Sequence, residues 1–520
     1  MSETDLVRTG IKGLDAILFG SIPRSNVILV QGPTGSGKTL LGIEFIYRGI
    51  VEYDEPAIIV AFENSPDKLV RDAATFGWDL QKLQAQKKLQ IIFTTPHVLD
   101  QELRSPDSLL LETVAEIGAQ RIFIDGIGLL GQSSNGDTLG AANEIVSYRE
   151  LLQRVIEGLD RENLTAMLSH EVGVTSESIL TLEATAFLAD TVIHLGRSRQ
   201  GRRMVRSIEV IKSRGQDFDS GEHTLKISGN QGLQVFRRVQ APIRMLAAQP
   251  TSTAKRSVTG VEALDTLIGG GLFDGSTTMV VGVSGVGKTV LGTHLLWEGA
   301  TRQGTRGLLI SLDEHPAQII RNAATLGLDL QTLIDSGQLH ILFESPQELD
   351  IDTHFAKITD MVEKYDIQRM VIDGMTSYST ALKDQSVYRD FFHALVAYSK
   401  FRLMTAFFNY ENPEFLGIST FMPDFPVSSI VDNIILLSMV ELRSSLRRCL
   451  TVVKARGSKH QFDSREYEIG QGGINLLPFD EDAQSAPVPF AGYTSILSRA
   501  PTRLSARDVN GLQHAAAGSK

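Results

Sequence analysis

Cysteine is almost absent from this chain, and its absence limits what the protein can be. The 520 residues contain one cysteine, Cys449, which excludes an internal disulfide framework and any zinc site built from several cysteines. No apolar run is long enough to span a bilayer; typical examples are MTAFF at 404–408 and NIILL at 433–437. The N-terminus, MSETDLVRTG, has no basic-then-apolar signal pattern. We therefore expect a cytoplasmic protein without membrane association.

An excess of positive charge is also lacking. The chain has 50 Lys and Arg against 61 Asp and Glu, a formal net charge of −11. General affinity for nucleic acid depends on clustered basic residues that release counterions from phosphates. The two basic runs, at 196–203 and 442–448, are modest, and we expect both to be solvated turns. Nucleic acid is therefore not an expected partner, although an acidic chain can still hold DNA in a local channel.

A duplicated set of segments is the strongest pattern in the sequence. TGIKGLDAIL (9–18) is repeated as TGVEALDTLI (259–268), RIFIDG (121–126) as RMVIDG (369–374), and IKSRG (211–215) as VKARG (453–457). The order is the same in both halves, and the offset drifts slowly from 250 to 242 residues. Such drift indicates two copies of one domain that have gained small insertions and deletions.

The boundaries of the two copies follow from composition. We expect domains at 1–240 and 258–480, a linker at 241–257 and a flexible tail at 481–520, because the linker and the tail lack apolar periodicity. Within each copy, short apolar runs alternate with longer segments of helical periodicity. The predicted fold is therefore α/β, with a mostly parallel sheet covered by helices on both faces.

Each copy contains one phosphate-binding loop. GPTGSGKT (32–39) and GVSGVGKT (282–289) match the pattern G-x-x-x-x-G-K-[ST], and each follows an apolar run and opens a helix-like segment. Backbone N–H groups of such a loop close around phosphates at a helix N-terminus. The predicted ATP contacts are Gly32, Thr34, Gly35, Ser36, Gly37, Lys38 and Thr39 in the first copy, and Gly282, Ser284, Gly285, Val286, Gly287, Lys288 and Thr289 in the second.

An aspartate ends one apolar run of each copy downstream of the loop. Asp125 and Asp373 fit the carboxylate that steadies Mg²⁺ beside the phosphates, together with Thr39 and Thr289. A single strand-terminal Asp is more often a turn or a helix cap. Its recurrence in both copies favours a shared role as a Mg²⁺ ligand.

A further acidic position follows the second apolar run of each copy. The first copy has Glu63 followed by Asn64, and the second has Asp313 followed by Glu314. A carboxylate beside the γ-phosphate can orient or deprotonate the attacking nucleophile. An exposed polar strand end would show the same spacing. Because one copy has an amide where the other has a second acid, we expect the two sites to activate different nucleophiles.

Two adjacent serines occur in the second copy alone. Ser428 and Ser429 precede an apolar run that begins near Asp432. At the offset of 242, Asp432 matches Asp190, so the serines match Ala186 and Phe187. A structural requirement of the fold would be expected in both copies, which makes the serines candidate phosphoacceptors.

Taken together, these motifs resemble the KaiC family, the double-domain RecA-like ATPases and autokinases of the cyanobacterial clock and their prokaryotic relatives. The resemblance covers nearly the whole chain and includes IGGGLFDGS (268–276) and SRAPTRL (498–504). It implies two tandem RecA-like P-loop domains, ATP and Mg²⁺ bound between subunits, and a double ring of six chains that assembles with ATP. The first ring is expected to hydrolyse ATP, and the second to phosphorylate its own Ser428 and Ser429 and to reverse that reaction.

The resemblance also assigns roles to further residues and partners. Lys212, Arg214, Lys454 and Arg456 correspond to residues that reach the γ-phosphate of a neighbouring subunit. Without the family, a solvated strand face would be the better interpretation of these four. A KaiB-like or response-regulator partner is implied. A KaiA-like activator is not expected, because the tail matches the family loosely beyond PTRL.

Three departures separate this chain from the clock protein itself. It has Ser-Ser where that family has Ser-Thr, Asn64 in place of a second glutamate, and Asp313 in place of a glutamate. Two other functions fit the core motifs, namely a RecA/RadA-type DNA-dependent ATPase and an ATP-gated scaffold without kinase activity. Stimulation by single-stranded DNA would favour the former, and ATP-dependent assembly without phosphorylation the latter.

Overall fold

The computed structural model describes residues 6–104, 108–128, 141–172, 185–200, 203–240, 255–382, 384–411, 427–442 and 445–477. The chain divides into two compact units, Met1–Arg238 and Val239–Lys520. Most of the expected linker, 241–254, and the expected tail, 481–520, lie outside the described residues. The last residues of the expected linker are described, and Arg256–Ser257 form a short strand of the second unit.

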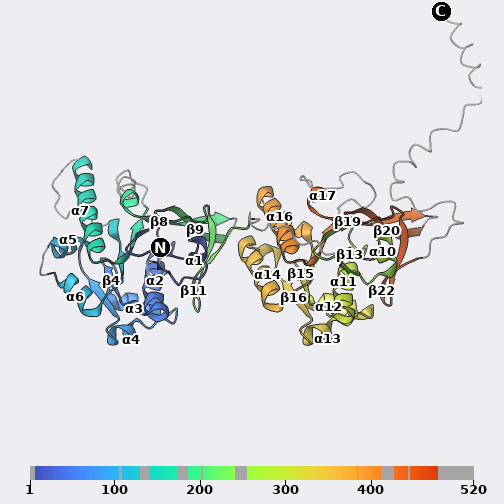
Figure 1. The fold of residues 1–520 in the computed structure, drawn as a ribbon, viewed down its shortest axis with the longest axis horizontal. Coiled ribbons are helices and arrows are strands. Elements are labelled where there is room, and N and C mark those ends of the chain that lie inside the picture. The colour runs from blue at the N-terminus through green and yellow to red at the C-terminus, as the bar shows by residue number, and fades with distance from the viewer. Residues whose placement is uncertain are drawn as a thin grey trace, which may run out of the picture. The chain divides into compact units, whose positions relative to one another are not determined.

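The first unit is built on a nine-stranded sheet in the order β11-β10-β9-β8-β3-β7-β6-β4-β5. Figure 1 labels β4, β8, β9 and β11 of this sheet. The strands from β8 to β5 are parallel, and β8 to β11 continue the sheet as antiparallel hairpins. Their bounds are β3 (Val27–Gly32), β4 (Ala57–Ala61), β5 (Leu89–Phe93), β6 (Arg121–Asp125), β7 (Thr165–Glu171), β8 (Thr191–Gln200), β9 (Arg203–Ser213), β10 (His223–Ser228) and β11 (Gly232–Phe236), with a separate pair of β1 (Leu6–Val7) and β2 (Ile22–Pro23).

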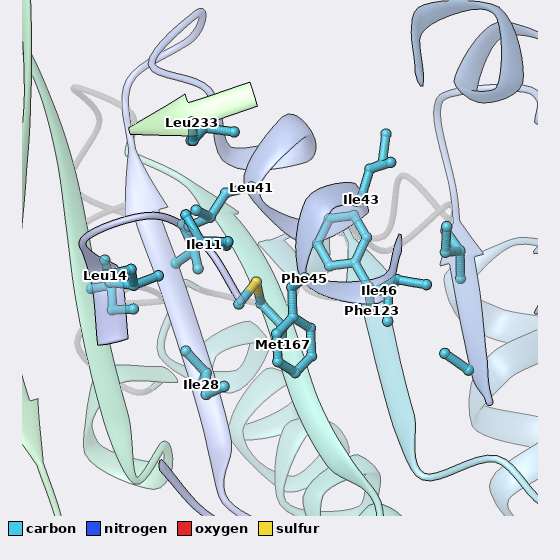
Figure 2. Close-up of a cluster of buried hydrophobic side chains, with 14 of the residues drawn as sticks. Ile11, Leu14, Ile28, Leu41, Ile43, Phe45, Ile46, Phe123, Met167 and Leu233 are labelled. Carbon is cyan, nitrogen blue, oxygen red and sulfur yellow. The ribbon is translucent and has the colours of Figure 1, made fainter. Parts of the chain in front are cut away.

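Helices cover both faces of this sheet, as predicted. They are α1 (Leu14–Ile17), α2 (Lys38–Tyr53), α3 (Pro66–Ala74), α4 (Leu80–Ala85), α5 (Pro96–Arg104), α6 (Leu109–Ile117) and α7 (Ala141–Arg161). The core of one face joins Leu41 and Phe45 of α2 to Phe123 and Met167 of the sheet (Figure 2). The opposite core joins strand residues such as Ile122 to α7. Because β4 is buried on both faces, its sequence AIIVA is an unbroken apolar run rather than an alternating one.

The second unit repeats the same topology. Its nine-stranded sheet has the order β22-β21-β20-β19-β14-β18-β17-β15-β16, which matches the first unit strand for strand. The strands are β14 (Thr277–Gly282), β15 (Gly307–Ser311), β16 (Leu339–Phe343), β17 (Arg369–Asp373), β18 (Thr405–Glu411), β19 (Asn433–Leu442), β20 (Ser445–Ala455), β21 (Arg465–Gly470) and β22 (Gly473–Leu476), with a separate pair of β12 (Arg256–Ser257) and β13 (Leu272–Phe273). The prediction of two tandem RecA-like α/β domains is confirmed.

The helices of the second unit again lie on both faces of its sheet. They are α10 (Glu262–Leu267), α11 (Lys288–Arg302), α12 (Pro316–Thr325), α13 (Leu330–Asp335), the 3₁₀ helix η3 (Pro346–Glu348), α14 (Ile351–Tyr365), α15 (Met375–Ala381), α16 (Gln385–Phe401) and α17 (Val427–Ile430). One core contains residues of α11, and the other contains residues of α14 and α16. Cys449 is buried in β20 as a small apolar residue.

The two basic runs are the ends of long hairpins rather than isolated turns. In the first unit β8 ends at Gln200 and β9 begins at Arg203; in the second, β19 ends at Leu442 and β20 begins at Ser445. Arg197 and Arg199 are exposed there, so the expectation of solvated positions is correct for these two residues. Among the described residues, no helix combines the length and apolarity needed to cross a membrane.

Candidate nucleotide sites

Each phosphate-binding loop joins a central strand to a long helix. The loop of the first unit connects β3 to α2, and that of the second connects β14 to α11. Both loops therefore lie at the carboxyl ends of parallel strands, where open α/β sheets bind ligands. Gly37 and Gly287 stand at the helix N-caps with φ of 113° and 106°, a backbone conformation that side chains with a Cβ rarely adopt. The loops are thus shaped for anion binding before any ligand enters.

The loop lysines are held over the backbone of their own loops. Lys38 Nζ donates to the carbonyls of Gly32 at 2.8 Å and Pro33 at 3.0 Å, and Lys288 Nζ makes the same two contacts with residues 282 and 283, each at 2.9 Å. Burial lowers the pKa of both lysines, while nearby carboxylates oppose that shift. One of the carboxylates that favour the ammonium form of Lys38 is Glu63.

The residues predicted to bind Mg²⁺ come together in both units. Thr39 Oγ1 lies 3.1 Å from both carboxylate oxygens of Asp125, and Thr289 Oγ1 donates to Asp373 Oδ2 at 2.8 Å. Burial raises the pKa of Asp373, and hydrogen bonds to its carboxylate oppose this effect. A hydroxyl and a carboxylate are hard oxygen ligands, which suit a Mg²⁺ ion whose other ligands are phosphate oxygens and water. The donor set therefore fits the predicted metal.

Each of these aspartates has a further partner that sequence reasoning missed. Ser169 Oγ of β7 donates to Asp125 Oδ1 at 2.6 Å, and Asn409 Nδ2 of β18 donates to Asp373 Oδ1 at 2.8 Å. Ser169 and Asn409 occupy the same place in the two sheets, on the strand next to the aspartate strand. A polar residue near the end of an otherwise apolar run was the signal that could have identified them.

The two acidic positions have different surroundings, as the sequence predicts. In the first unit Asn64 Nδ2 donates to Asp125 Oδ2 at 3.3 Å, so an amide supports the metal-binding carboxylate. In the second unit burial raises the pKa of Glu314, and the negative charges of Asp373 and Asp313 raise it further. One site therefore has a hydrogen bond where the other has charge repulsion.

The catalytic candidates themselves also differ. Glu63 is exposed two residues beyond the end of β4. Asp313, at the matching position after β15, accepts a hydrogen bond from the hydroxyl of Ser377, a contact that the sequence did not predict. The carboxylate of Asp313 is therefore held from a second element, α15.

The basic pairs late in each unit bind the segment that precedes the neighbouring strand of the sheet, which is β8 in the first unit and β19 in the second. Arg214 donates to the carbonyl of Phe187 at 3.0 Å, and Arg456 donates to the carbonyl of Ser429 at 3.4 Å. Lys212 and Lys454 donate to carbonyls of the same two segments, at Ala189 (2.6 Å) and Val431 (2.7 Å) respectively. In a single chain, these basic residues thus brace a backbone segment.

The same contacts place the candidate phosphoacceptor segment. Ser429 is exposed on the short helix α17, while the side chain of Ser428 lies outside the described residues. Asp432 accepts from the backbone N–H of Thr277 at 3.0 Å, and Asp190 accepts from that of Val27 at the same distance. The aspartates therefore anchor the central strand in both units.

A cavity of about 580 Å³ opens beside the second loop. Its lining includes the polar residues Lys288, Thr289 and Asp373 and the apolar residues Ile319 and Leu328. Such a lining offers polar groups for phosphates and apolar surface for a base. Ile319 belongs to α12, a helix that sequence reasoning did not assign to the site.

Comparison with known proteins gives the same result for both halves of the chain. The sequence model of the KaiC ATPase family matches residues 7–240 and again residues 257–481. Among similar proteins, the circadian clock oscillator protein KaiC of Parathermosynechococcus lividus is 32% identical over 511 residues, covering 97% of this chain and 90% of that protein. Circadian clock oscillator protein KaiC of Picosynechococcus sp. is 31% identical over 504 residues, with 96% and 92% covered, and KaiC 1 of Synechocystis sp. is 30% identical over 520 residues, with 99% and 95% covered.

Proposed function

The chain belongs to the KaiC ATPase family, and on that premise we propose that it is an ATP-hydrolysing enzyme that phosphorylates its own serines. In this proposal six chains form a double ring with ATP between subunits. The N-terminal unit hydrolyses ATP. The C-terminal unit transfers phosphate to Ser428 and Ser429 and also removes it.

One observation carries the kinase proposal. The two units share their topology, their loops, their Mg²⁺ ligands and the anchoring aspartates Asp190 and Asp432, but only the second has a hydroxyl pair beside that anchor. Arg214 and Arg456 brace equivalent carbonyls, at Phe187 and Ser429, which supports the alignment of the serines with two residues that lack hydroxyls. The hydroxyl pair therefore distinguishes the second unit from the first, although the two share one fold.

In the N-terminal unit we assign hydrolysis to Glu63. Lys38 and the loop N–H groups bind the phosphates, and Mg²⁺ held by Thr39 and Asp125 would neutralise charge on them. Glu63 is exposed, close to Lys38, and therefore accessible to the water that attacks the γ-phosphate. The proton of that water passes to the Glu63 carboxylate as the bond to ADP breaks.

In the C-terminal unit the nucleophile is a serine hydroxyl. Its Oγ forms a bond to the γ-phosphorus, the bond between that phosphorus and the bridging oxygen of ADP breaks, and ADP leaves. The hydroxyl proton passes to a carboxylate, for which Asp313 is the first candidate and Glu314 the second. Lys288 would bind the phosphates, and Thr289 and Asp373, which are hydrogen-bonded to each other, would hold the metal, as we assign to their counterparts in the other unit.

Between subunits, we assign Lys212, Arg214, Lys454 and Arg456 to the γ-phosphate of the neighbour. Their contacts include backbone carbonyls, which a phosphate can replace as acceptors of charge-assisted hydrogen bonds. Arg214 and Arg456 also form ion pairs with Asp190 and Asp432, each at 3.5 Å. A KaiB-like protein or a response regulator is the proposed signalling partner, and the cytoplasm is the proposed location. Nucleic acid is not part of the proposal.

Phosphopeptide mapping tests this function. We expect that full-length protein incubated with Mg-ATP incorporates phosphate on Ser428, Ser429 or both, as read by mass spectrometry of peptides. Lys288→Met should abolish the modification, because it removes the charge that binds the phosphates of the C-terminal site.

The same incubation supplies its own control. Release of inorganic phosphate shows that ATP is being consumed, and added single-stranded DNA should leave that rate unchanged. Absence of phosphate from both serines while ATP is hydrolysed would contradict the kinase assignment. Strong stimulation by DNA would favour a recombinase or helicase instead.

A further inference from the structure

Helix α15 follows the metal-binding Asp373 directly and faces the cavity of the C-terminal unit. Five consecutive residues of this helix, 376–380, carry hydroxyls, and the first three are Thr376, Ser377 and Tyr378. At the offset of 248 that relates Asp373 to Asp125, the first unit has Gly, Leu, Leu, Gly and Gln at 128–132, none of which carries a hydroxyl. The hydroxyls are therefore peculiar to the unit that carries the two serines.

The second of these hydroxyls fixes the candidate base. Ser377 Oγ donates to Asp313 Oδ1 at 2.5 Å. The other carboxylate oxygen, Oδ2, lies only 2.4 Å from the position that a Cβ atom would occupy if Gly374 were replaced by any other residue. Gly374 has φ of 93° and caps the N-terminus of α15, so this close approach needs glycine. Ser377 thus holds one oxygen of Asp313, and the missing side chain of Gly374 leaves room for the other.

The helix is itself tied to its surroundings on two sides. Thr376 Oγ1 accepts from the backbone N–H of Glu411 at 3.0 Å, which links α15 to the end of β18. On the other side the Tyr378 hydroxyl lies 2.6 Å from His354 Nε2, and His354 Nδ1 pairs with Glu344. Tyr378 and His354 are fully buried, and a buried network that satisfies its members restricts motion.

We propose that Ser377 is a positioning residue for phosphoryl transfer in the C-terminal unit, and that the buried Tyr378–His354–Glu344 chain holds its helix in place. The inference rests on the proposed function of that site. Aspartate is one methylene shorter than glutamate, so its carboxylate has less reach and its placement matters more. The hydroxyl of Ser377 holds Asp313 in one orientation. This support matters for catalysis because a misplacement of about 1 Å can cost roughly a hundredfold in rate.

The test measures the rate of phosphoserine formation at Ser428 and Ser429 in variants of the full-length protein. Ser377→Ala should slow it roughly ten- to hundredfold at saturating ATP with little change in KM for ATP, whereas Ser377→Thr should retain most of it. Adding Asp313→Glu to Ser377→Ala should recover part of the rate, because the longer side chain needs less support. Tyr378→Phe, which removes only the hydroxyl, should have a smaller effect of the same sign.

Ser379→Ala is the matched control, because the Ser379 hydroxyl bonds only to the carbonyl of Thr376 within the same helix. An unchanged rate in Ser377→Ala, or phosphate found on Ser377 itself, would overturn the positioning role. If the wild type forms no phosphoserine, the proposed function fails instead. In that case, the ATP hydrolysis that remains in the Glu63→Gln variant reports the activity of the C-terminal site. If adding Ser377→Ala to that variant leaves this remaining hydrolysis unchanged, the inference about Ser377 is overturned independently.

Discussion

Glu63 and Asp313 occupy equivalent positions in the two units, but their side chains and surroundings differ. Both acids are exposed, but the Glu63 side chain is longer and the Asp313 carboxylate accepts a hydrogen bond from Ser377. The residue that follows each acid differs as well, since Asn64 donates to a metal-binding aspartate and Glu314 repels one. We therefore expect the two sites to activate different nucleophiles.

Replacement of Glu63 by glutamine tests the assignment of hydrolysis. Glu63→Gln should lower the rate of ATP hydrolysis in the N-terminal unit by about 10² or more, because a general base contributes roughly 10²- to 10⁴-fold. Phosphorylation of Ser428 and Ser429 should remain measurable, since their site has its own acids. Phosphate release and phosphoserine content, measured in one sample, check both statements.

The control for this variant is Asp67→Asn, an exposed acid in the first turn of α3. It should leave both activities near the wild-type values. An equal loss of hydrolysis and phosphorylation in Glu63→Gln would contradict the division of labour between the units.

At the scale of single residues, sequence could predict contacts within a motif but not those between strands. Lys38 and Thr39 are fixed by the spacing of one loop, and Asp125 by its place at the end of an apolar run. Ser169 and Ser377 touch their partners from elements 44 and 64 residues away in the chain. No local pattern specifies such pairs, because the fold alone brings them together.

At the scale of elements, the helix after each loop is joined to the last hairpin of its unit by a buried acceptor. In the first unit Glu44 of α2 accepts from the backbone N–H of Leu233 at 2.7 Å, and in the second His294 of α11 accepts through Nε2 from that of Ile474 at 2.8 Å. His294 must be neutral to accept this bond. Burial lowers its pKa to about 4, below the value of about 6.5 for an exposed histidine.

This difference makes the C-terminal unit sensitive to acid. Above pH 6.5 the ring is neutral in both the folded and the unfolded chain, and the contribution of His294 is fully present. As the pH falls from 6.5 toward 4, the unfolded chain binds a proton that the folded chain excludes, so stability decreases. Between pH 7.5 and 5 the loss from this residue is about 2 kcal/mol in the free energy of unfolding.

Urea unfolding of wild type and His294→Gln at pH 7.5 and pH 5 checks this prediction. The glutamine carbonyl can accept the same N–H without titrating, so the variant should lose about 2 kcal/mol less than the wild type over this interval. Parallel loss in the two proteins would show that His294 does not contribute to the acid sensitivity.

The sequence predicted the parallel strands well and the hairpins poorly. A strand such as β4 is buried on both faces, so it is an apolar run that can be recognised directly. The hairpin of β8 and β9 mixes buried and exposed residues, and its arginines suggested a turn. Its role as an extension of the sheet depends on register with neighbouring strands, which periodicity alone does not give.

At the scale of the whole molecule, the chain consists of two copies of one ATP-binding domain, and the second copy carries additional features. The strand order and the anchoring aspartates are the same in both, while the serines, the hydroxyls of α15 and Asp313 belong to the second. We propose that these additions turn an ATPase unit into a kinase for a neighbouring copy of the chain. This proposal requires that phosphate pass between subunits.

Mixed assemblies of two variants test this requirement most directly. One chain carries Lys288→Met and keeps Ser428 and Ser429; the other keeps Lys288 and carries Ser428→Ala and Ser429→Ala. After co-expression and incubation with Mg-ATP, mass spectrometry locates the phosphate. The account predicts phosphate on the serines of the Lys288→Met chain, although that chain alone remains unmodified. Absence of phosphate from the mixed assembly, with the wild type modified in parallel, would contradict transfer between subunits.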